Sequence, residues 1–505
     1  MRSCIAGALL LLACTPAAWA GFSFETVEAA AQVLARAAYK PPGDVLAPAL
    51  AQLDHARYGM IRYRADARLW AHTASPFSIG FFINGNDYPD PVKINEVDTG
   101  GVHAVRFDPG NFDLGQSKLD AKALATAGFS GLAVHVRSPG KNAAHPTQRV
   151  LVFQGATLFS GHGFGQVRGA GARGLAIDTG LLSGEEFPRF TKFWIERPAN
   201  GDTTLVIDAL MDSKRATGAY RFVVTPGKTL KVEVRARIFL RGYVTLLGVA
   251  PINSMYLYGE NDDAHGDGDY RPEVHDSDGL QIHSGTGEWI WRPLVNPARL
   301  LTTSFAMTNP QGFGLMQRDR QFSDYEDLRV RYDRKPSVWV TPESAWGAGR
   351  VELVELPTPD QTHTNIVAFW APDAPPKPGQ PLDLAYRVEW QGDDQTHPPS
   401  AWAVQTRTGH GFSTHPQSGA QFVVDFVGSA LQRLAPDTPL TSVVSVDPNG
   451  QVLEQRVVYN AATDGWRLFL RIKRQDDGKP VEMRAYLRNG NDTVSETWSY
   501  ILPPS

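Results

Sequence analysis

Short runs in which apolar and polar residues alternate recur along most of this 505-residue chain. Residues 204–210 (Thr-Leu-Val-Ile-Asp-Ala-Leu) and 230–236 (Leu-Lys-Val-Glu-Val-Arg-Ala) are two examples, and Gly, Pro, Asn and Asp separate such runs. A period of two places apolar side chains on one face of a β-strand. The 47 glycines and 36 prolines also disfavour long helices. The pattern therefore predicts a mainly β protein built from sandwiches.

One amphipathic helix is predicted near the start of the chain. Its apolar residues recur at helical spacing, namely Phe24, Val27, Ala31, Leu34 and Ala38.

The first 20 residues have the features of a secretory signal peptide. Arg2 is followed by an apolar run over residues 5–13, and Ala18-Trp19-Ala20 is a small-x-small cleavage motif. We expect cleavage after Ala20. No later run approaches the roughly 20 apolar residues that cross a bilayer, so we expect no membrane insertion.

Cysteine usage and charge exclude several functions. Cys4 and Cys14 are the two cysteines, and both lie in the predicted signal peptide. Disulfides, thiol nucleophiles and cysteine-bound zinc are therefore excluded for the mature chain. The formal net charge of −4 gives no attraction to nucleic acid, so we expect no nucleic-acid partner.

A proline-rich segment predicts a domain boundary. Residues 371–381 carry five prolines and favour an extended linker. Alternating residues 382–390 follow, with further predicted strands at 422–426, 452–459, 466–472, 481–487 and 497–502. We expect a signal peptide at 1–20, a large β-sandwich at 21–370, the linker at 371–381 and an immunoglobulin-like β-sandwich at 382–505.

Chemistry is densest in residues 270–293, which hold four carboxylates, two histidines, two arginines, two tryptophans and a tyrosine. Carboxylates can act in acid/base chemistry or hold sugar hydroxyls, and flat aromatic rings can stack on sugar rings. A phosphate or nucleic-acid site would be more basic. The stretch predicts a site for an uncharged, hydroxyl-rich polymer. Its expected substrate-binding residues are Tyr270, Arg271, His275, Asp278, Glu288, Trp289, Trp291 and Arg292.

Other motifs give weaker indications. Residues 169–174 match G-x-G-x-x-G, but no helix pattern follows, so turn glycines are the better interpretation. Residues 261–269 are acidic enough for Ca²⁺ but lack the EF-hand pattern. On a single strand His275 and His283 would lie roughly 26 Å apart, too far to share a metal. No G-x-S-x-G elbow supports a Ser-His-Asp triad. We therefore expect neither a metal nor a cofactor.

Several longer phrases resemble the family of periplasmic glucan biosynthesis proteins G and D. They span essentially the whole mature chain, and they lie at residues 174–178, 183–190, 193–198, 216–220, 275–277, 287–293, 309–315, 339–342 and 495–500. The signal peptide lacks a twin arginine, which resembles the G branch.

This resemblance implies a large N-terminal β-sandwich of the mutarotase-like supersandwich type, with a long cleft, followed by a smaller immunoglobulin-like sandwich. It also implies a periplasmic role in making osmoregulated glucans with a β-1,2-linked backbone. In the family, a membrane glycosyltransferase makes and exports the backbone. Some members are inverting β-1,2-glucan hydrolases or transglycosylases.

The resemblance carries catalysis over residue by residue. The aspartate of the family's His-Asp-Ser phrase, on the base side, falls on Asp276, and Asp278 would share its face of a strand. The family's general acid precedes Asn-Ile-Val-Ala-aromatic-Trp, where this chain has Thr364. Threonine cannot protonate a leaving oxygen. Asp360 is the nearest alternative acid, roughly 13 Å away along a strand.

Two function classes follow. An enzyme would cut or transfer β-1,2-glucan with a base and an acid, whose carboxyl groups would lie about 6.5–9.5 Å apart. A binding protein would present or guide nascent glucan beside the glycosyltransferase, with Tyr270, Trp289 and Trp291 as sugar platforms. Thr364 favours the second class. A third interpretation assigns both tryptophans to the core.

Overall fold

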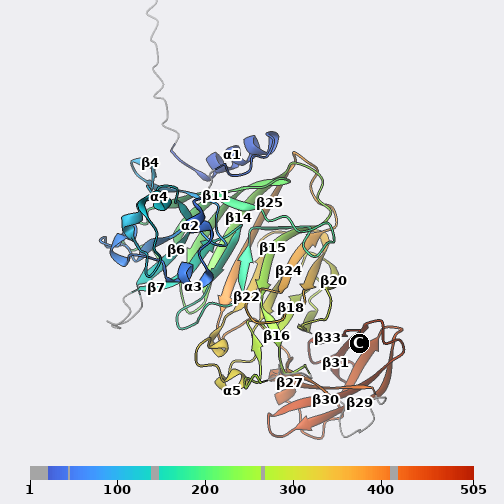
Figure 1. The fold of residues 1–505 in the computed structure, drawn as a ribbon. Coiled ribbons are helices and arrows are strands. Elements are labelled where there is room, and N and C mark those ends of the chain that lie inside the picture. Colours follow the sequence, from blue (N-terminus) through green and yellow to red (C-terminus); the bar gives the residue numbers. More distant parts are fainter. Residues whose placement is uncertain (1–20, 44–45, 138–146, 263–267, 410–418, 505) are drawn as a thin grey trace, which may run out of the picture.

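The computed structural model describes residues 21–43, 46–137, 147–262, 268–409 and 419–504 (Figure 1). The predicted signal peptide and both cysteines lie outside these ranges. Strands make up 47% of the chain and helices 10%, so the prediction of a mainly β protein is confirmed. No helix in the described ranges is long and apolar enough to cross a membrane.

Two large sheets form the main body of the molecule. The first sheet contains, in spatial order, β2 (Phe77–Ile83), β6 (Phe129–Arg137), β7 (Thr147–Gln154), β8 (Leu158–Gly161), β9 (Gly171–Arg173), β15 (Leu247–Ser254), β24 (Ile366–Pro372), β23 (Ala348–Glu355) and β20 (Leu301–Thr308), and β10 (Leu175–Ile177) pairs with β15. Strand β15 is buried along its whole length because it is covered on both faces.

The second sheet runs the length of the molecule. Its order is β28 (Thr441–Val446), β31 (Val481–Asn489), β33 (Thr497–Leu502), β19 (Trp289–Pro293), β18 (Gly279–His283), β21 (Gly312–Met316), β22 (Ser337–Pro342), β25 (Pro381–Gln391), β14 (Leu230–Leu240), β13 (Ala216–Thr225), β12 (Leu205–Asp212), β11 (Arg189–Glu196), β3 (Lys93–Asp98) and β4 (Gly101–Ala104), and β32 (Asp492–Thr493) pairs with β31. In β14 buried and exposed residues alternate as predicted.

The main core lies between these two sheets. Phe153 and Phe159 of the first sheet pack against Phe222 of the second, with ring centroids 5.0 and 5.2 Å apart. Such burial of large apolar side chains is the dominant stabilising term in a sandwich of this size. The pairing of two sheets around one core is consistent with the predicted β-sandwich.

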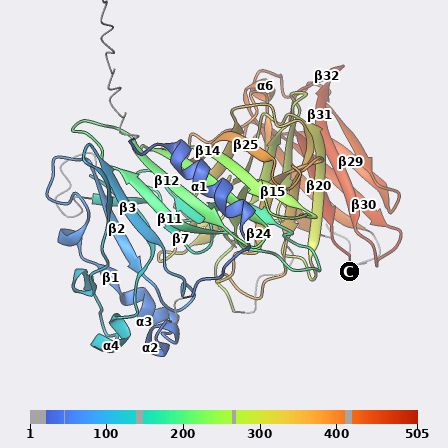
Figure 2. The ribbon, with the colours of Figure 1, turned by 90° about the horizontal axis from the view of Figure 1, so that it is seen from above.

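The predicted N-terminal helix is present as α1 (Phe24–Arg36), although it ends before Ala38. It runs across the outer face of the second sheet (Figure 2). Phe24, Val27 and Ala31 pack there against Trp194 and Phe239. The remaining helices and minor strands are short, namely α2 (Pro48–Ala51), α3 (His55–Met60), α4 (Ala121–Leu124), α5 (Phe322–Tyr325), α6 (Ser429–Gln432), the 3-10 turns at Ala65–Ala67, Pro109–Asn111 and Tyr332–Arg334, and the strand pairs β1 (Arg62–Tyr63) with β5 (Phe112–Asp113) and β16 (Tyr256–Tyr258) with β17 (Val274–His275).

A second, smaller core lies at the C-terminal end. Strands β28, β31 and β33 face a separate four-stranded sheet of β26 (Trp402–Gly409), β27 (Ala420–Val427), β30 (Gly465–Arg474) and β29 (Gly450–Asn460). We call these seven strands the C-terminal sandwich. The five strands predicted between residues 422 and 502 all belong to it.

The expected boundary at 371–381 differs from the observed strand pairing. Residues 382–390 lie in β25, which pairs with β14 and β22 in the middle of the large second sheet. The proline-rich segment thus crosses from β24 in one large sheet to β25 in the other. Alternation identified the strand correctly but carries no information about which sheet it joins. The C-terminal sandwich begins after Gln391, with β26 as its first strand.

The dinucleotide-like residues 169–174 run into strands rather than a helix. Residues 171–173 form β9 and residues 175–177 form β10, which agrees with the interpretation of these glycines as turn residues.

Candidate functional site

Asp276 lies in the bend between β17 and β18. Its backbone N–H donates to the carbonyl of Met255 (2.8 Å), and its carboxylate forms an ion pair with the ammonium of Lys335. The side chain of Asp276 is 16% exposed and that of Lys335 is 8% exposed, so Lys335 is buried and Asp276 keeps a small accessible surface.

A short network extends from Lys335. The Lys335 ammonium lies 4.2 Å from the ring centroid of Tyr332, and the Tyr332 hydroxyl donates to the side-chain oxygen of Gln361 (2.9 Å). Burial, followed by the charge of Asp276, raises the pKa of Tyr332, so its hydroxyl keeps its proton. Asp276, Lys335, Tyr332 and Gln361 form what we call the Asp276 site.

Arg271 joins this network from the predicted stretch. Its guanidinium donates to Gln361 (2.6 Å) and forms ion pairs with Asp269 (2.6 Å) and Asp327 (3.0 Å). Two carboxylates therefore already satisfy its charge. Arg271 positions Gln361, and this differs from the expected direct contact with substrate.

The predicted acid side lies on the loop before β24. The side-chain amide of Asn365 forms two hydrogen bonds with the backbone of Tyr256. Its oxygen accepts from the N–H (2.9 Å) and its nitrogen donates to the carbonyl (2.9 Å). Asp276 is tied to Met255 and Asn365 to Tyr256, which are consecutive residues. The exposed Thr364 and the partly exposed Asp276 are thus anchored to the same short segment.

Asp360 does not have the environment of a general acid. Its side chain is 51% exposed, and its carboxylate accepts from the hydroxyl (2.6 Å) and the N–H (2.8 Å) of Thr362. These hydrogen bonds, with a further contribution from His363, hold the pKa of Asp360 below its usual value. A carboxyl group that is ionised so readily cannot deliver a proton near neutral pH, which argues against the predicted catalytic role.

Asp276 and Asp278 do not share a strand face. Strand β17 ends at His275 and β18 begins at Gly279, so the segment between them is bent. The Asp278 carboxylate turns inward and accepts from the N–H groups of Arg318 (2.8 Å) and Asp319 (3.1 Å). Asp278 therefore holds the backbone after β21, and its predicted contact with substrate is not supported.

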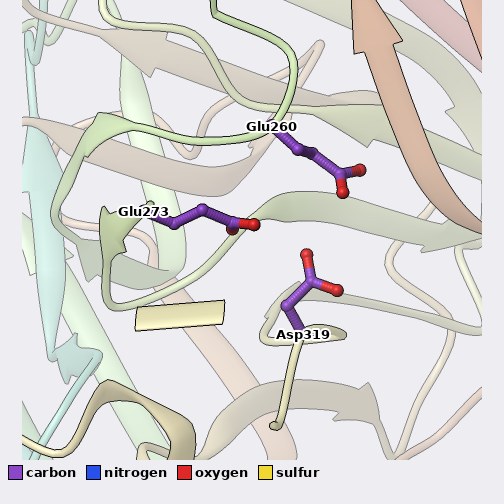
Figure 3. Close-up of side chains that lie close together, drawn as sticks. All are labelled: Glu260, Glu273 and Asp319. Atoms are coloured by element: carbon purple, nitrogen blue, oxygen red, sulfur yellow. The ribbon is translucent and has the colours of Figure 1, made fainter. Parts of the chain in front are cut away.

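Three carboxylates converge beside Asp278. Glu260 follows β16, Glu273 precedes β17 and Asp319 follows β21, and their side chains point toward one another (Figure 3). One oxygen from each lies within 4.8 Å of the others. Burial, and then the neighbouring negative charges, raises the pKa of Glu260 and of Asp319 well above their ordinary values. We call these three residues the acidic cluster.

His275 balances the acidic cluster from within the protein. It is fully buried, and its two ring nitrogens contact Glu273 (2.7 Å) and Gln317 (3.0 Å). Burial lowers the pKa of His275, but the hydrogen bond and charge of Glu273, with Asp278 and Asp319, outweigh it and raise the pKa to about 9. His275 is thus buried and paired with Glu273, and its expected role in substrate binding stays a prediction.

The acidic cluster supplies oxygen ligands of the kind that Ca²⁺ and Mg²⁺ prefer. The adjoining cavity has a volume of about 20 Å³, enough for about one water molecule. Three carboxylates are fewer than the six to eight oxygens that Ca²⁺ takes. Shared protons and the His275 charge already offset the repulsion. His275 and His283, considered above as a metal pair, lie on strands of different sheets.

Two predicted residues, Arg292 and Glu288, belong to the junction with the C-terminal sandwich. Arg292 is fully buried and forms a two-pronged ion pair with Glu482 (2.9 Å for both bonds). Glu288 pairs with Arg484 (2.6 Å) and accepts from Thr497 (2.7 Å). These charges hold the two sandwiches together, which corrects their expected assignment to substrate binding.

Trp291 is a core residue. It is 4% exposed, the Arg318 guanidinium lies 3.5 Å from its ring centroid, and a side chain at Gly279 would overlap the ring. Neither face of Trp291 is open to a sugar, so the alternative of a core tryptophan holds for this residue.

Trp289 and Tyr270 keep accessible surface. Trp289 is half-buried, and one face of its indole stacks on His283 with centroids 4.0 Å apart. Tyr270 is 72% exposed. Of the three predicted sugar platforms, these two remain available.

The sequence did not point to Lys335, Tyr332 or Gln361. They lie 56–85 residues beyond Asp276 in the chain, on turns without a recognisable motif. Glu260 and Asp319 were missed for the same reason, because the pairing of β16 with β17 and of β18 with β21 brings them together.

Comparisons with known proteins identify the family of this chain. Residues 22–502 match the family described as "Periplasmic glucan biosynthesis protein, MdoG". "Glucans biosynthesis protein G" of Ralstonia nicotianae is 51% identical over 506 residues, covering 99% of both chains. Proteins of the same name from Pseudomonas aeruginosa and Pseudomonas paraeruginosa are each 47% identical over 508 residues, covering 99% of this chain and 96% of theirs. This chain therefore belongs to the periplasmic glucan biosynthesis protein family.

Proposed function

We propose that this protein acts in the biosynthesis of periplasmic glucans by binding the β-1,2-linked backbone at the Asp276 site. Membership of the family over residues 22–502 supports the pathway. The exposed ring of Tyr270, the half-buried ring of Trp289 and the partly exposed Asp276 supply the stacking surfaces and the acceptor that a neutral sugar chain uses.

The observation that carries the proposal is that the expected catalytic base, Asp276, is present, whereas the expected general acid is replaced by Thr364. Asp276 is held by Lys335 in a defined position, which suits a base that orients a water molecule. The matching position on the other side is Thr364, which has no proton to give at the required acidity. Asp360, four residues away, is exposed and has a lowered pKa. The protein therefore binds and guides glucan with little cleavage.

The proposed setting is the periplasm, reached through the signal peptide at residues 1–20. The partner that supplies the backbone is the membrane glycosyltransferase of glucan synthesis, as in the family. The protein would receive the nascent chain as it emerges.

Incubation with linear β-1,2-glucan, followed by measurement of reducing ends, tests this proposal. Wild-type protein should release few or none, and Thr364→Asp should raise the rate, because general acid catalysis typically contributes about 10²–10⁴-fold. Thr362→Asp is the matched control on the same exposed loop and should give no gain. Rapid hydrolysis by the wild type would contradict the proposal.

The second candidate function is an inverting hydrolase or transglycosylase. The preserved Asp276–Lys335 pair favours it. Asp276→Asn keeps the shape of the side chain but cannot accept a proton. If the enzyme reading is right, this variant should lose turnover while glucan affinity changes less than a few-fold. Asp360→Asn should then also abolish turnover if Asp360 is the acid, and leave it unchanged if another group is.

Replacing Trp289 tests glucan binding independently of catalysis. Trp289→Ala should weaken β-1,2-glucan binding by about 1–3 kcal/mol, as expected for the loss of an aromatic anchor. Trp291→Ala is the contrasting variant, because a buried tryptophan should cost about 3–5 kcal/mol of stability. Equal affinity of wild type and Trp289→Ala in calorimetry would exclude Trp289 as a platform.

A further inference from the structure

A cavity of about 530 Å³ lies on the outer side of the first large sheet, over β2, β6 and β7. His135 of β6 lines it and alternates with Val134 and Val136 of the main core, so this face points away from the core. Helix α3 and strand β1 contribute further walls. A volume of this size is typical of pockets that enclose a small organic ligand.

Four arginines line this cavity, namely Arg62, Arg68, Arg149 and Arg168, and we call it the arginine cavity. The lining contains no aspartate or glutamate among the described residues. Within the same described ranges none of the four arginines forms an ion pair, whereas arginines elsewhere commonly do. Their clustering is notable in a chain whose net charge is −4.

The arginines have few neutral partners. Arg68 donates from Nη1 to the Thr147 hydroxyl (2.9 Å), but its Nε is buried without an acceptor. Arg62 donates to the carbonyls of Gly59 and Ile61. Most of the hydrogen-bonding capacity of these guanidinium groups is left for a ligand.

Burial and repulsion among the positive charges of the cavity lower the pKa of two of its groups, Arg149 and His135. Burial, and then the charges of Arg168, Arg62 and Arg68, lowers the pKa of Arg149. Burial, and then Arg68 and Arg149, lowers the pKa of His135 to about 3, so the imidazole is neutral at physiological pH. Arginine does not release its proton in proteins, so the cavity stays positively charged and a bound anion would relieve the repulsion.

We propose that the arginine cavity binds a sugar-sized organic anion through a phosphoryl or carboxylate group. Guanidinium groups match both groups with paired hydrogen bonds. The partly buried rings of Tyr63 and Phe82 line the cavity and give the apolar wall for the rest of the ligand. Arg168 lies next to the Asp276 site, because Val167 donates to the carbonyl of Arg334 and Gly169 lies against the side chain of Lys335. The inference does not depend on glucan binding there.

Calorimetry with three probes of similar size tests the proposal. Glucose 6-phosphate and glucuronate carry the two candidate groups, and glucose carries neither. At least one anion should bind the wild-type protein at constant ionic strength, and glucose should not. The anion that binds identifies the preferred group. Failure of both anions to bind, or equal binding of glucose, would overturn the proposal.

Variants locate the bound anion. Arg149→Gln combined with Arg168→Gln should weaken anion binding at least about tenfold, since each charged hydrogen bond contributes substantially. Arg433→Gln is the matched control, because Arg433 is an exposed arginine beside α6 in the C-terminal sandwich. Unchanged affinity in the double variant would place the anion elsewhere and refute the assignment.

A readout in the wild-type protein avoids dependence on variant folding. A bound anion next to His135 should raise its pKa from about 3, which NMR of the imidazole resonances measures with and without saturating anion. His363 is a solvent-exposed control and should not shift. A His135 resonance that is unmoved by the anion would contradict the proposal.

Discussion

The acidic cluster and the arginine cavity solve the same electrostatic problem in different ways. Each brings like charges together in a protein whose other charges are mostly paired. In the acidic cluster, burial raises the pKa of Glu260 and Asp319, so protons remove part of the repulsion. The arginines cannot lose their protons at accessible pH. Protonation can therefore lower the charge of the acidic cluster without a ligand, whereas the arginine cavity keeps its positive charge and can accept an anion.

The largest expected change in the free energy of unfolding comes from removing one charge of the buried Glu273–His275 pair. Glu273→Gln removes the carboxylate that pairs with the buried His275. The free energy of unfolding should fall by about 3–5 kcal/mol, as when one partner of a buried ion pair is lost. Urea denaturation at pH 7 measures it. Glu288→Gln breaks a half-exposed pair and should cost at most about 1 kcal/mol. Equal losses of stability in the two variants would show that the buried pair contributes no more than the half-exposed pair.

Stability should fall as pH rises, because of the acidic cluster and His275. The folded-state pKa of His275 is raised to about 9, so its contribution is complete below its unfolded pKa of about 6.5. That contribution is lost as pH rises through 9. A shift of this size corresponds to about 3 kcal/mol.

Glu260 and Asp319 act in the same direction, since their raised pKa values favour the protonated, folded form. Their contribution is complete below about pH 4 and is lost as pH rises through their folded pKa values. Unfolding titrations at pH 5, 7 and 9.5 should thus give steadily lower stability. A flat profile would mean that the cluster is not proton-balanced.

A smaller effect is expected when a protonated acid is replaced by an amide. Asp319→Asn should change the free energy of unfolding by less than about 1 kcal/mol at pH 5, the acidic end of this series, because burial and the neighbouring carboxylates favour the protonated form of Asp319. As pH rises, the variant should lose less stability than the wild type. A large loss at pH 5 would show that the carboxyl group of Asp319 itself is needed.

The smallest effect concerns the arginine cavity. Arg149→Gln relieves repulsion among the four arginines and should stabilise the anion-free protein by about 0.5 kcal/mol at low salt. The gain should vanish in 1 M NaCl, where the Debye length is about 3 Å. Thermal denaturation in a buffer without phosphate or carboxylate measures it, with Arg433→Gln as control. A salt-independent change would point to altered packing.

Much of the fold was predictable because the alternation of apolar and polar residues within a strand shows which of its faces is buried. The alternation in residues 230–236 and the five C-terminal strands agree with β14 and the C-terminal sandwich. Pairing between distant strands leaves no local trace. That is why residues 382–390 were expected in the wrong sandwich.

The candidate site was predictable in part, for a related reason. Asp276 stands in a recognisable phrase, and the structure gives it a defined partner in Lys335. Residue types alone do not show which way a side chain points. Trp291 and Arg292 are residue types that suit a sugar site, yet they lie at the junction with the C-terminal sandwich. Lys335, Gln361 and the arginine cavity are assembled from segments far apart in the chain, so no local pattern marks them.

The parallel pairing of β19 with β33 has a mechanical consequence. Through it a single sheet runs from the main body into the C-terminal sandwich. The buried pair of Arg318 with Glu496 and the pair of the buried Arg292 with the partly exposed Glu482 join the two parts. A chain cut after Gln391 would expose the unpaired edge of β19 and leave both guanidinium groups without a counter-charge. The sequence predicted a linker between the two sandwiches, whereas the structure joins them through a continuous sheet. We therefore expect the two sandwiches to unfold as one cooperative unit.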